Sequence, residues 1–345
     1  MPAIHSPIPL AIKDSAHWEE LRRTTLNGGE AAALFETVAN EFDVTENVDD
    51  VDEYEEDGEP MSPYMSPLGL WALKSGRIEP RQPSTNSRVQ WARQIEPIIA
   101  DTIASKSGWV LRRPSEYYMH PSVRGMGLKL RYEVEVDGTA VFYPLVVKTV
   151  AVEDRWKWRN AVGEWVIPGH ILIEMQHILS ITGLPHAYLG ILIGGCEDRM
   201  FVVERDESLI FEIEGAVADF WDAVDLGREP AANMKRDAWV IKRLYLHVDP
   251  QNVVDRSDDA EIKKLVADMR YHSSQSTVHK KAADELRQQL TAMIGDAKHV
   301  LLGDAVVNSS IIEGSHVSYY REPYRKVTVS KLTKKHAGLP LTSAA

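Results

Sequence analysis

The sequence is poor in several features that define large classes of proteins. It contains one cysteine, Cys196, among 345 residues, which excludes an internal disulfide framework and a cysteine-based zinc cluster and fits a reducing cytoplasm. Its longest apolar runs, such as AYLGILIGG, are far shorter than a membrane span, and no charged start followed by an apolar block opens the chain. We therefore expect a cytoplasmic protein without a membrane span, with Cys196 as a buried spectator.

Familiar catalytic and phosphate-binding signatures are also missing. Neither GxxxxGK[ST] nor GxGxxG occurs, so the GGE stretch at Gly28 is no phosphate loop. The twelve histidines include no HExxH, and we expect His170 and His177, seven residues apart on one helix face, to pack rather than to bind metal. The sequence has no internal repeat, which excludes a solenoid.

Basic residues are in the minority, because the formal net charge is −12. That balance argues against a surface coated with positive charge for nucleic acid. Much of it comes from one segment, Glu41 to Glu59, which holds eleven acids and no base. We interpret this segment as a solvated loop; the alternative is a phosphate mimic that occupies a basic groove.

Periodicity predicts a mixed α/β protein. Helical patterns cover 15–25, 28–42, 66–76, 87–108, 169–183 and 216–224, and strand patterns cover 127–138, 141–152, 186–195 and 199–206. Asp137-Gly138 predicts a hairpin between the first two strands. Beyond about residue 246 we expect a long charged helix over 259–295 and a β element over 314–332. The central sheet should be mixed and flanked by helices.

One strand poses a question of charge. YPLVVKTVAV reads as a buried strand that carries a single lysine, Lys148. An unpaired ammonium is costly in such a strand, so a charged group must face it.

The order of these elements, and seven segments within them, carry a family resemblance. The segments are RTTLNGGEAAALF, SPYMSPLGLWALKSG, RQIEPIIA, GLKLRYEVEVDG, PLVVKTV, EMQHILSITGLPHAYLGILIGG and FVVERDESLIFEIEGAVADFWDAV. Together they resemble the YqaJ-like viral recombinase family, relatives of phage lambda exonuclease in the PD-(D/E)XK nuclease superfamily. The resemblance implies a nuclease-fold core over 1–245 with an acidic insertion at 41–60, a C-terminal helical arm and β element over 246–333, and a flexible tail over 334–345.

The resemblance also implies a site. Nucleases of this type hold Mg²⁺ or Mn²⁺ with two or three carboxylates beside a lysine. The family positions that are kept here are Glu30, Glu96, Lys148 and Gln176. We expect Glu96, Glu174 and Gln176 to line one cavity beside Lys148. The alternatives are solvated helix residues for Glu30 and Glu96, and a cap on buried backbone for Gln176.

Other family positions have changed. The two acids that the family uses for metal are replaced by Arg131 and Val146, and Gly29 stands in the place of a serine seven residues after Arg22. Glu174, on the neighbouring predicted helix, offers a carboxylate in place of the acid that is missing at Val146. The alternative role of Glu174 is an ion pair with Lys148.

Glu133 lies two residues from Arg131, on the same strand face by its spacing. The candidate metal ligands are therefore Glu96, Glu174 and Glu133. If the protein is an active nuclease, its cofactor would be Mg²⁺ or Mn²⁺. If the site is degenerate, the protein would use no metal cofactor.

Candidate DNA contacts are Arg22 and the RWKWR cluster, with Arg155, Lys157 and Arg159 beside Trp156 and Trp158. These residues would contact phosphates or stack on unpaired bases, and the alternatives are core packing and contact with a protein partner. The basic segment 320–335 is a further candidate.

Three functions stay open, and the sequence does not decide whether the protein is an enzyme. The losses at three motif positions favour a degenerate nuclease fold kept to bind double-stranded DNA ends or a recombination partner. The second possibility is a working metal-dependent exonuclease with relocated carboxylates. The third is an acidic DNA mimic that inhibits a DNA-binding enzyme. By resemblance, the partners include a single-strand annealing recombinase and further copies of the chain in a ring trimer, in a phage or prophage setting.

Overall fold

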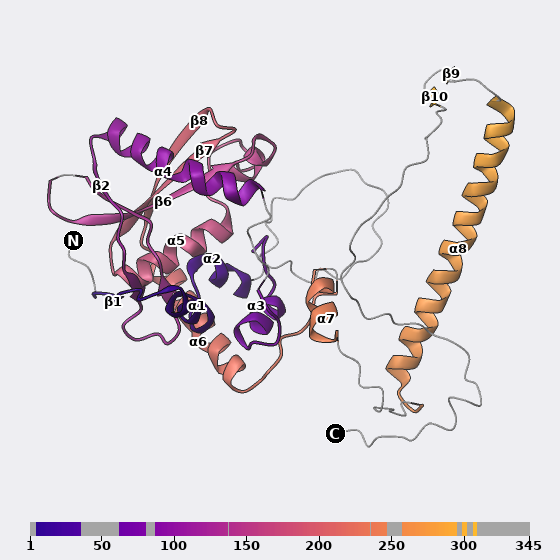
Figure 1. The fold of residues 1–345 in the computed structure, drawn as a ribbon, viewed down its shortest axis with the longest axis horizontal. Coiled ribbons are helices and arrows are strands. Elements are labelled where there is room, and N and C mark those ends of the chain that lie inside the picture. The colour runs from indigo at the N-terminus through magenta and orange to yellow at the C-terminus, as the bar shows by residue number, and fades with distance from the viewer. Residues whose placement is uncertain are drawn as a thin grey trace. The chain divides into compact units, whose positions relative to one another are not determined.

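The computed structural model describes residues 5–35, 62–80, 87–136, 138–234, 236–246, 257–294, 299–301 and 306–308. The chain divides into two compact units, Met1–Leu244 and Tyr245–Ala345 (Figure 1). The acidic segment 41–59, the predicted β element over 314–332 and the tail from 334 lie outside the described residues.

A five-stranded mixed sheet forms the centre of the first unit. Its strand order is β2-β5-β6-β7-β8, from β2 (Val110–Arg112), β5 (Tyr132–Glu135), β6 (Phe142–Val150), β7 (His186–Ile193) and β8 (Glu197–Glu204). β5 and β6 pair antiparallel, as expected of the predicted hairpin, and β6 pairs parallel with β7. The parallel pair needs a crossover, which α5 (Gly169–Thr182) supplies. The predicted central mixed sheet is confirmed.

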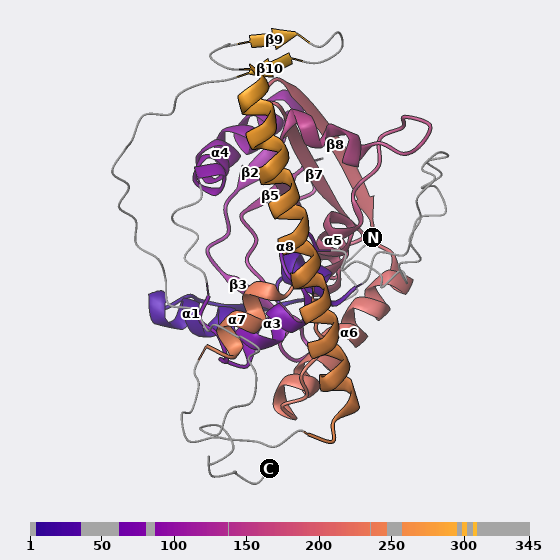
Figure 2. The same cartoon turned by 90° about the vertical axis from the view of Figure 1, so that its right-hand side faces the viewer.

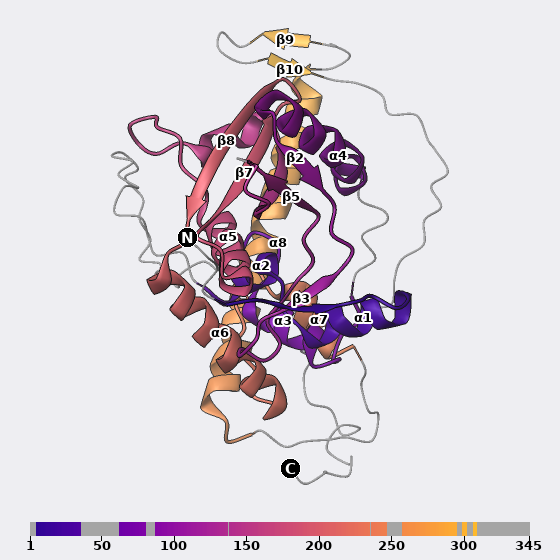
Figure 3. The ribbon, with the colours of Figure 1, turned by 90° about the vertical axis from the view of Figure 1, so that its left-hand side faces the viewer.

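Helices cover both faces of this sheet (Figures 2 and 3). On one face α4 (Ser87–Ser107) packs Ile99 and Ile103 against Leu145 and Val147 of β6. On the other face α5 packs its apolar side chains against β7 and β8. Successive residues of a strand point to opposite faces, so the even-numbered residues of β6, including Lys148, point towards α5. This alternation directs the lysine to the functional site.

A second layer of short elements packs beyond α5. It comprises α1 (Ser15–Thr24), α2 (Gly28–Ala31), η1 (Ala32–Leu34), α3 (Pro67–Lys74), α6 (Glu207–Asp225), α7 (Ala238–Leu244) and a small sheet of β1 (Ile8–Leu10), β3 (Tyr117–Met119) and β4 (Gly127–Leu128). The helix expected over 28–42 is wrong in length, because α2 and η1 end at Leu34 and Phe35 is extended. Ala31, Ala32 and Ala33 are buried, so this stretch packs into the core on more than one side.

The second unit contains α8 (Ala260–Ile294), which agrees with the predicted long helix, and a hairpin of β9 (His299–Leu301) and β10 (Val306–Asn308). The hairpin was not anticipated from the sequence. Within the described part of the chain, none of the helices combines the length and the apolar character that a membrane span requires.

Cys196 is exposed, which corrects the expectation of a buried thiol. It lies in the turn between β7 and β8 directly after Gly194 and Gly195, both at positive φ. The chain leaves the buried strand β7 after Ile193 and reaches the surface in this turn. The apolar run of β7 therefore ends before Cys196, which is exposed.

His177 on α5 makes the fold sensitive to acid. Its ring is buried, with Nε2 3.1 Å from the carbonyl oxygen of Gly127, and burial lowers its pKa to about 4. The unfolded chain takes up a proton here below about pH 6.5, whereas the folded chain does so only near pH 4. Stability is therefore lost as pH falls through this window.

We expect His177 to account for roughly 1.5 kcal/mol of the free energy of unfolding lost between pH 6.5 and pH 5, because the unfolded histidine is already half protonated at the upper pH and one pKa unit corresponds to about 1.4 kcal/mol. Urea denaturation of His177→Gln at both pH values should show a shallower loss. His272→Gln, a change at an exposed histidine of α8, is the control and should keep the wild-type dependence. Equal slopes for wild type and His177→Gln would contradict the assignment.

Candidate functional site

A large cleft of about 2350 Å³ opens beside β6 in the first unit. Its walls come from α1, α2, α4, the start of α5 and the segment that follows β6. Seven basic residues line it (Arg22, Arg93, Lys129, Arg131, Lys148, Lys157 and Arg159), against four acidic ones (Glu30, Glu96, Asp154 and Glu174). A chain of net charge −12 thus has a cleft with an excess of positive charge, which favours an anionic ligand.

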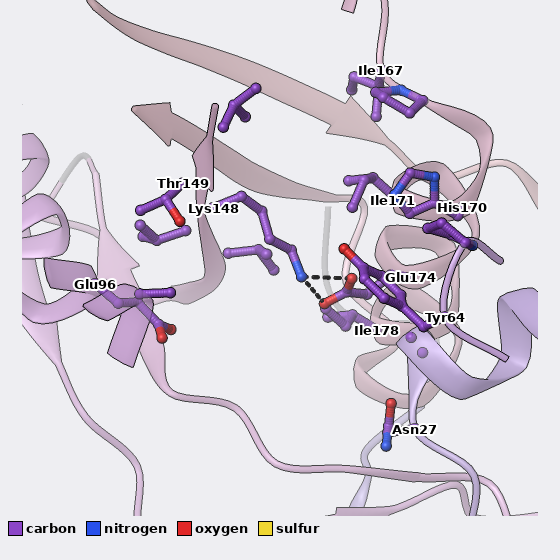
Figure 4. A pocket seen from close by; sticks show the side chains of 18 of the residues that line it. Asn27, Tyr64, Glu96, Lys148, Thr149, Ile167, His170, Ile171, Glu174 and Ile178 are labelled. Atoms are coloured by element: carbon purple, nitrogen blue, oxygen red, sulfur yellow. Dashed lines mark hydrogen bonds and ion pairs between the residues drawn. The ribbon is translucent and has the colours of Figure 1, made fainter. Parts of the chain in front are cut away.

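Lys148 lies inside this cleft and binds Glu174 (Figure 4). Its Nζ donates to both carboxylate oxygens of Glu174, at 2.8 and 2.7 Å. The two side chains are 31% and 20% exposed, so solvent screens the pair only in part. The ion pair offsets the cost of placing an ammonium in an apolar strand, which was the question that the sequence posed. Val146, on the same face of β6, lines the same cleft and offers no ligand atom.

A close contact between α2 and α5 fixes the position of Glu174. A Cβ atom at Gly28 would lie 2.8 Å from the carbonyl oxygen of Glu174 and 2.9 Å from its Cα. Only glycine allows the two backbones to approach this closely. At Gly29 an added Cβ would meet just the Asn27 Oδ1 atom, at 3.4 Å. Gly28 is thus required by packing, whereas Gly29 is not.

Glu96 and Arg131 form a second cation–carboxylate pair in the cleft. Nη1 of Arg131 donates to Oε2 of Glu96 at 2.5 Å. Burial raises the pKa of the Glu96 carboxyl, Arg131 and Lys148 act to lower it, and Glu174 raises it as well. These influences show that Glu96, Arg131, Lys148 and Glu174 share one electrostatic environment.

This donor set does not fit a divalent cation. Mg²⁺ and Mn²⁺ need several oxygen ligands, but each of the two central carboxylates is already bonded to a cationic side chain. Among the described residues no group of three or more histidine, cysteine, aspartate or glutamate side chains is arranged to hold a metal ion. The excess of basic over acidic residues in the lining favours an anionic ligand instead.

Glu30 has a structural role in the fold. Its carboxylate accepts from Nζ of Lys74, 2.9 Å from each oxygen, and from the backbone N–H of Asn27 at 3.1 Å. The Asn27 side chain accepts from the Glu30 N–H in return, which completes a capping box. Glu30 lines the cleft, but these bonds commit its carboxylate to the start of α2.

Gln176 does not line the cleft, contrary to our expectation. Its amide donates to the carbonyl oxygen of Glu204 at 2.7 Å and accepts from the N–H of Asp206 at 3.0 Å. Gln176 is buried and joins α5 to the chain between β8 and α6. This is the alternative that the sequence left open, a cap on buried backbone.

Glu133 also lies outside the set of residues that line the cleft. It stands opposite Arg112 in the β2–β5 register and pairs with it. Arg131 precedes β5 rather than belonging to it, so the two-residue spacing does not place Glu133 and Arg131 at one site. Glu133, an expected metal ligand, is therefore paired with a residue of β2 and not with the cleft.

Three of the four predicted DNA contacts line the cleft. Arg22 faces it with Glu19 3.8 Å away, Lys157 lies 2.9 Å from Asp154, and Arg159 donates to the carbonyl oxygen of Gly163 at 2.6 Å. Arg155 is not among the lining residues and instead pairs with Glu197 at 2.9 Å. This ion pair holds Arg155 at the start of β8.

Lys74 is a residue that the sequence reasoning missed. It is buried at the end of α3, and besides Glu30 it donates to the carbonyl oxygens of Arg22 and Thr25, at 2.6 and 2.8 Å. Burial lowers its pKa, while Glu30 raises it. Its signal in the sequence is a lysine at the end of an apolar run, LGLWALK, the same signal that singled out Lys148.

The fold and the cleft together define a mixed α/β protein in which cationic side chains are bonded to the carboxylates expected to bind metal. No family model matches the sequence. The chain is 25% identical over 248 residues to "Uncharacterized protein YqaJ" of Bacillus subtilis (strain 168), an alignment that covers 71% of this chain and 74% of that protein. This similarity confirms the resemblance to YqaJ that the motifs predicted.

Solved structures with some likeness to this chain include an alkaline exonuclease (LHK-Exo) from Laribacter hongkongensis. The alignment has 15% identity and a TM-score of 0.43, and covers 66% of this chain and all of that one. The same enzyme in complex with dAMP gives 16% identity and a TM-score of 0.41, over 65% of this chain and 99% of that one.

The contact at Gly28 can be tested by a matched pair of variants. Gly28→Ala should lower the free energy of unfolding by about 1–3 kcal/mol, because the new methyl group overlaps the backbone of α5 at Glu174. Gly29→Ala, one residue away with room for a Cβ, should change it by less than about 1 kcal/mol. Thermal or urea denaturation measures both, and similar losses for the two variants would show that the approach of α2 to α5 is not the constraint.

Proposed function

We propose that this protein binds the ends of double-stranded DNA in the cleft beside β6, as a nuclease-fold protein of DNA recombination that does not use a metal-dependent cutting step. One observation carries the proposal: Arg131 and Lys148 neutralise Glu96 and Glu174, so the cleft offers a net positive surface where this fold would otherwise hold a cation. DNA phosphates are recognised by such surfaces.

A second candidate function is an active exonuclease that uses Glu174 in place of the acid absent at Val146. The position of Glu174 favours it, since the carboxylate lies in the cleft within hydrogen-bond distance of Lys148. The bidentate pair with Lys148 and the presence of Arg131 argue for the first proposal. The inhibitor reading depends on the acidic segment 41–59, which is outside the described residues, and stays a prediction.

The annealing recombinase partner, the ring trimer, the phage setting and the cytoplasmic location also stay predictions from the resemblance. So do the domain boundaries near 245 and 333.

Arg22 and Arg23 provide a matched test of DNA binding. Both lie in the last turn of α1, but only Arg22 is among the residues that line the cleft. Arg22→Ala should weaken binding to a short duplex and reduce the slope of log K against log salt by about 0.9, the value for one phosphate contact. Arg23→Ala should leave both unchanged.

Fluorescence anisotropy at several salt concentrations makes this measurement. The proposal fails if the wild-type protein binds no duplex at low salt. Equal effects of the two arginine changes would place the binding surface elsewhere.

Metal binding separates the two candidate functions. A guanidinium at ~4 Å from a cation repels it by ~4 kcal/mol per unit of charge even at an effective dielectric near 20. We therefore expect calorimetry to detect no Mn²⁺ or Mg²⁺ binding in the millimolar range, and a labelled duplex to stay intact with either ion.

The double variant Arg131→Asp, Val146→Asp serves as the positive control, because it restores both acids and releases Glu96. It should gain Mn²⁺ binding. Tight Mn²⁺ binding by the wild type that Glu174→Gln abolishes would instead support the active exonuclease.

A further inference from the structure

The segment directly after β6 forms one wall of the cleft. It is η3 (Val152–Trp158), a 3-10 stretch, and Asp154, Trp156, Lys157 and Trp158 all line the cleft. The segment begins two residues beyond the end of β6, the strand that carries Lys148, so its position is tied to the sheet at the functional site.

Three tryptophans in this region have different structural roles. Trp158 is 5% exposed and packs into the core under α5, with its ring centroid 6.1 Å from that of Phe201. Trp165 is half-buried beneath the guanidinium of Arg159, which lies 3.5 Å from its ring centroid, and the two residues also form a β-bridge. These contacts fold the loop and anchor it to the sheet.

Trp156 takes no such part in the packing. It is 69% exposed, although tryptophan side chains are on average largely buried in folded proteins. Nζ of Lys157 lies 5.6 Å from its ring centroid and is itself held by Asp154 at 2.9 Å. The wall of the cleft therefore presents a flat apolar ring beside an ammonium whose position is fixed.

We propose that Trp156 is a stacking platform for an unpaired base at a DNA terminus, with Lys157 beside it for the phosphate of the same nucleotide. The proposal rests on the proposed function and narrows its ligand to a duplex with a single-stranded extension. Bases inside a duplex are stacked on each other, so their faces are closed to an indole, whereas an unpaired base offers its face whatever its identity. An exposed indole and an adjacent ammonium match the two parts of such a nucleotide.

The chain offers a matched control for this ring. Trp91 on α4 is 61% exposed, close to the value for Trp156, but is not among the residues that line the cleft. Trp156→Ala, Trp156→Phe and Trp91→Ala can then be compared on two labelled DNAs, a blunt duplex and the same duplex with a short single-stranded extension. Thermal melting verifies that each variant is folded.

Trp156→Ala should weaken binding to the extended duplex about tenfold, as expected for the loss of one stacked base. Binding to the blunt duplex should change less than about twofold, and the salt slope should stay the same because an indole releases no counterions. Trp156→Phe, which keeps an aromatic face, should recover most of the affinity, and Trp91→Ala should bind like the wild type.

The outcomes distinguish this inference from the proposed function. Wild-type protein that binds neither DNA overturns the proposed function and this inference with it. If the wild type binds both DNAs, but Trp156→Ala has no effect or weakens both equally, DNA-end binding stands and the stacking role is overturned.

Discussion

The ion pair between Lys148 and Glu174 is the interaction on which the rest of the site depends. An ammonium in a mostly apolar strand and a carboxylate on a mostly buried helix are each costly alone, and bidentate contact at 2.7 and 2.8 Å satisfies both. Removal of either partner would leave the other charge partly buried, which costs more than the pair contributes. β6 and α5 are thereby held in one relative position at the cleft.

The same pair determines what the cleft can bind. In a cation site, carboxylates face inwards without partners and their mutual repulsion is relieved by the metal. Here the guanidinium of Arg131 and the ammonium of Lys148 are bonded to the two carboxylates and offset their negative charge. The remaining lysines and arginines on the walls then add to a positive field in place of cancelling a negative one. The proposed preference for an anionic ligand rests on this balance of charge.

Much of this was accessible from the sequence. The strand alternation in PLVVKTV and the apolar period of α5 place Lys148 and Glu174 on facing surfaces, and the pairing of the two was one of the alternatives the sequence offered. Side chains that depend on the ends of elements were harder to place. Gln176 lies on the same helix as Glu174, but its side chain bonds to the chain beyond β8. Arg131 lies just before β5, where the two-residue period of a strand does not apply.

Packing between distant segments explains the other differences. The period of residues 28–42 indicates a continuous helix, yet α2 ends at Ala31 and η1 ends at Leu34. Ala31, Ala32 and Ala33 are buried against elements far away in the sequence, and such contacts leave no local signal. Gly28 is the clearest case: a family comparison draws attention to Gly29, where a serine is replaced, while the geometry assigns the constraint to its neighbour. The close approach at Gly28 fixes the backbone of Glu174, and Glu174 in turn orients Lys148, so a residue without a side chain helps to determine the charge distribution of the cleft.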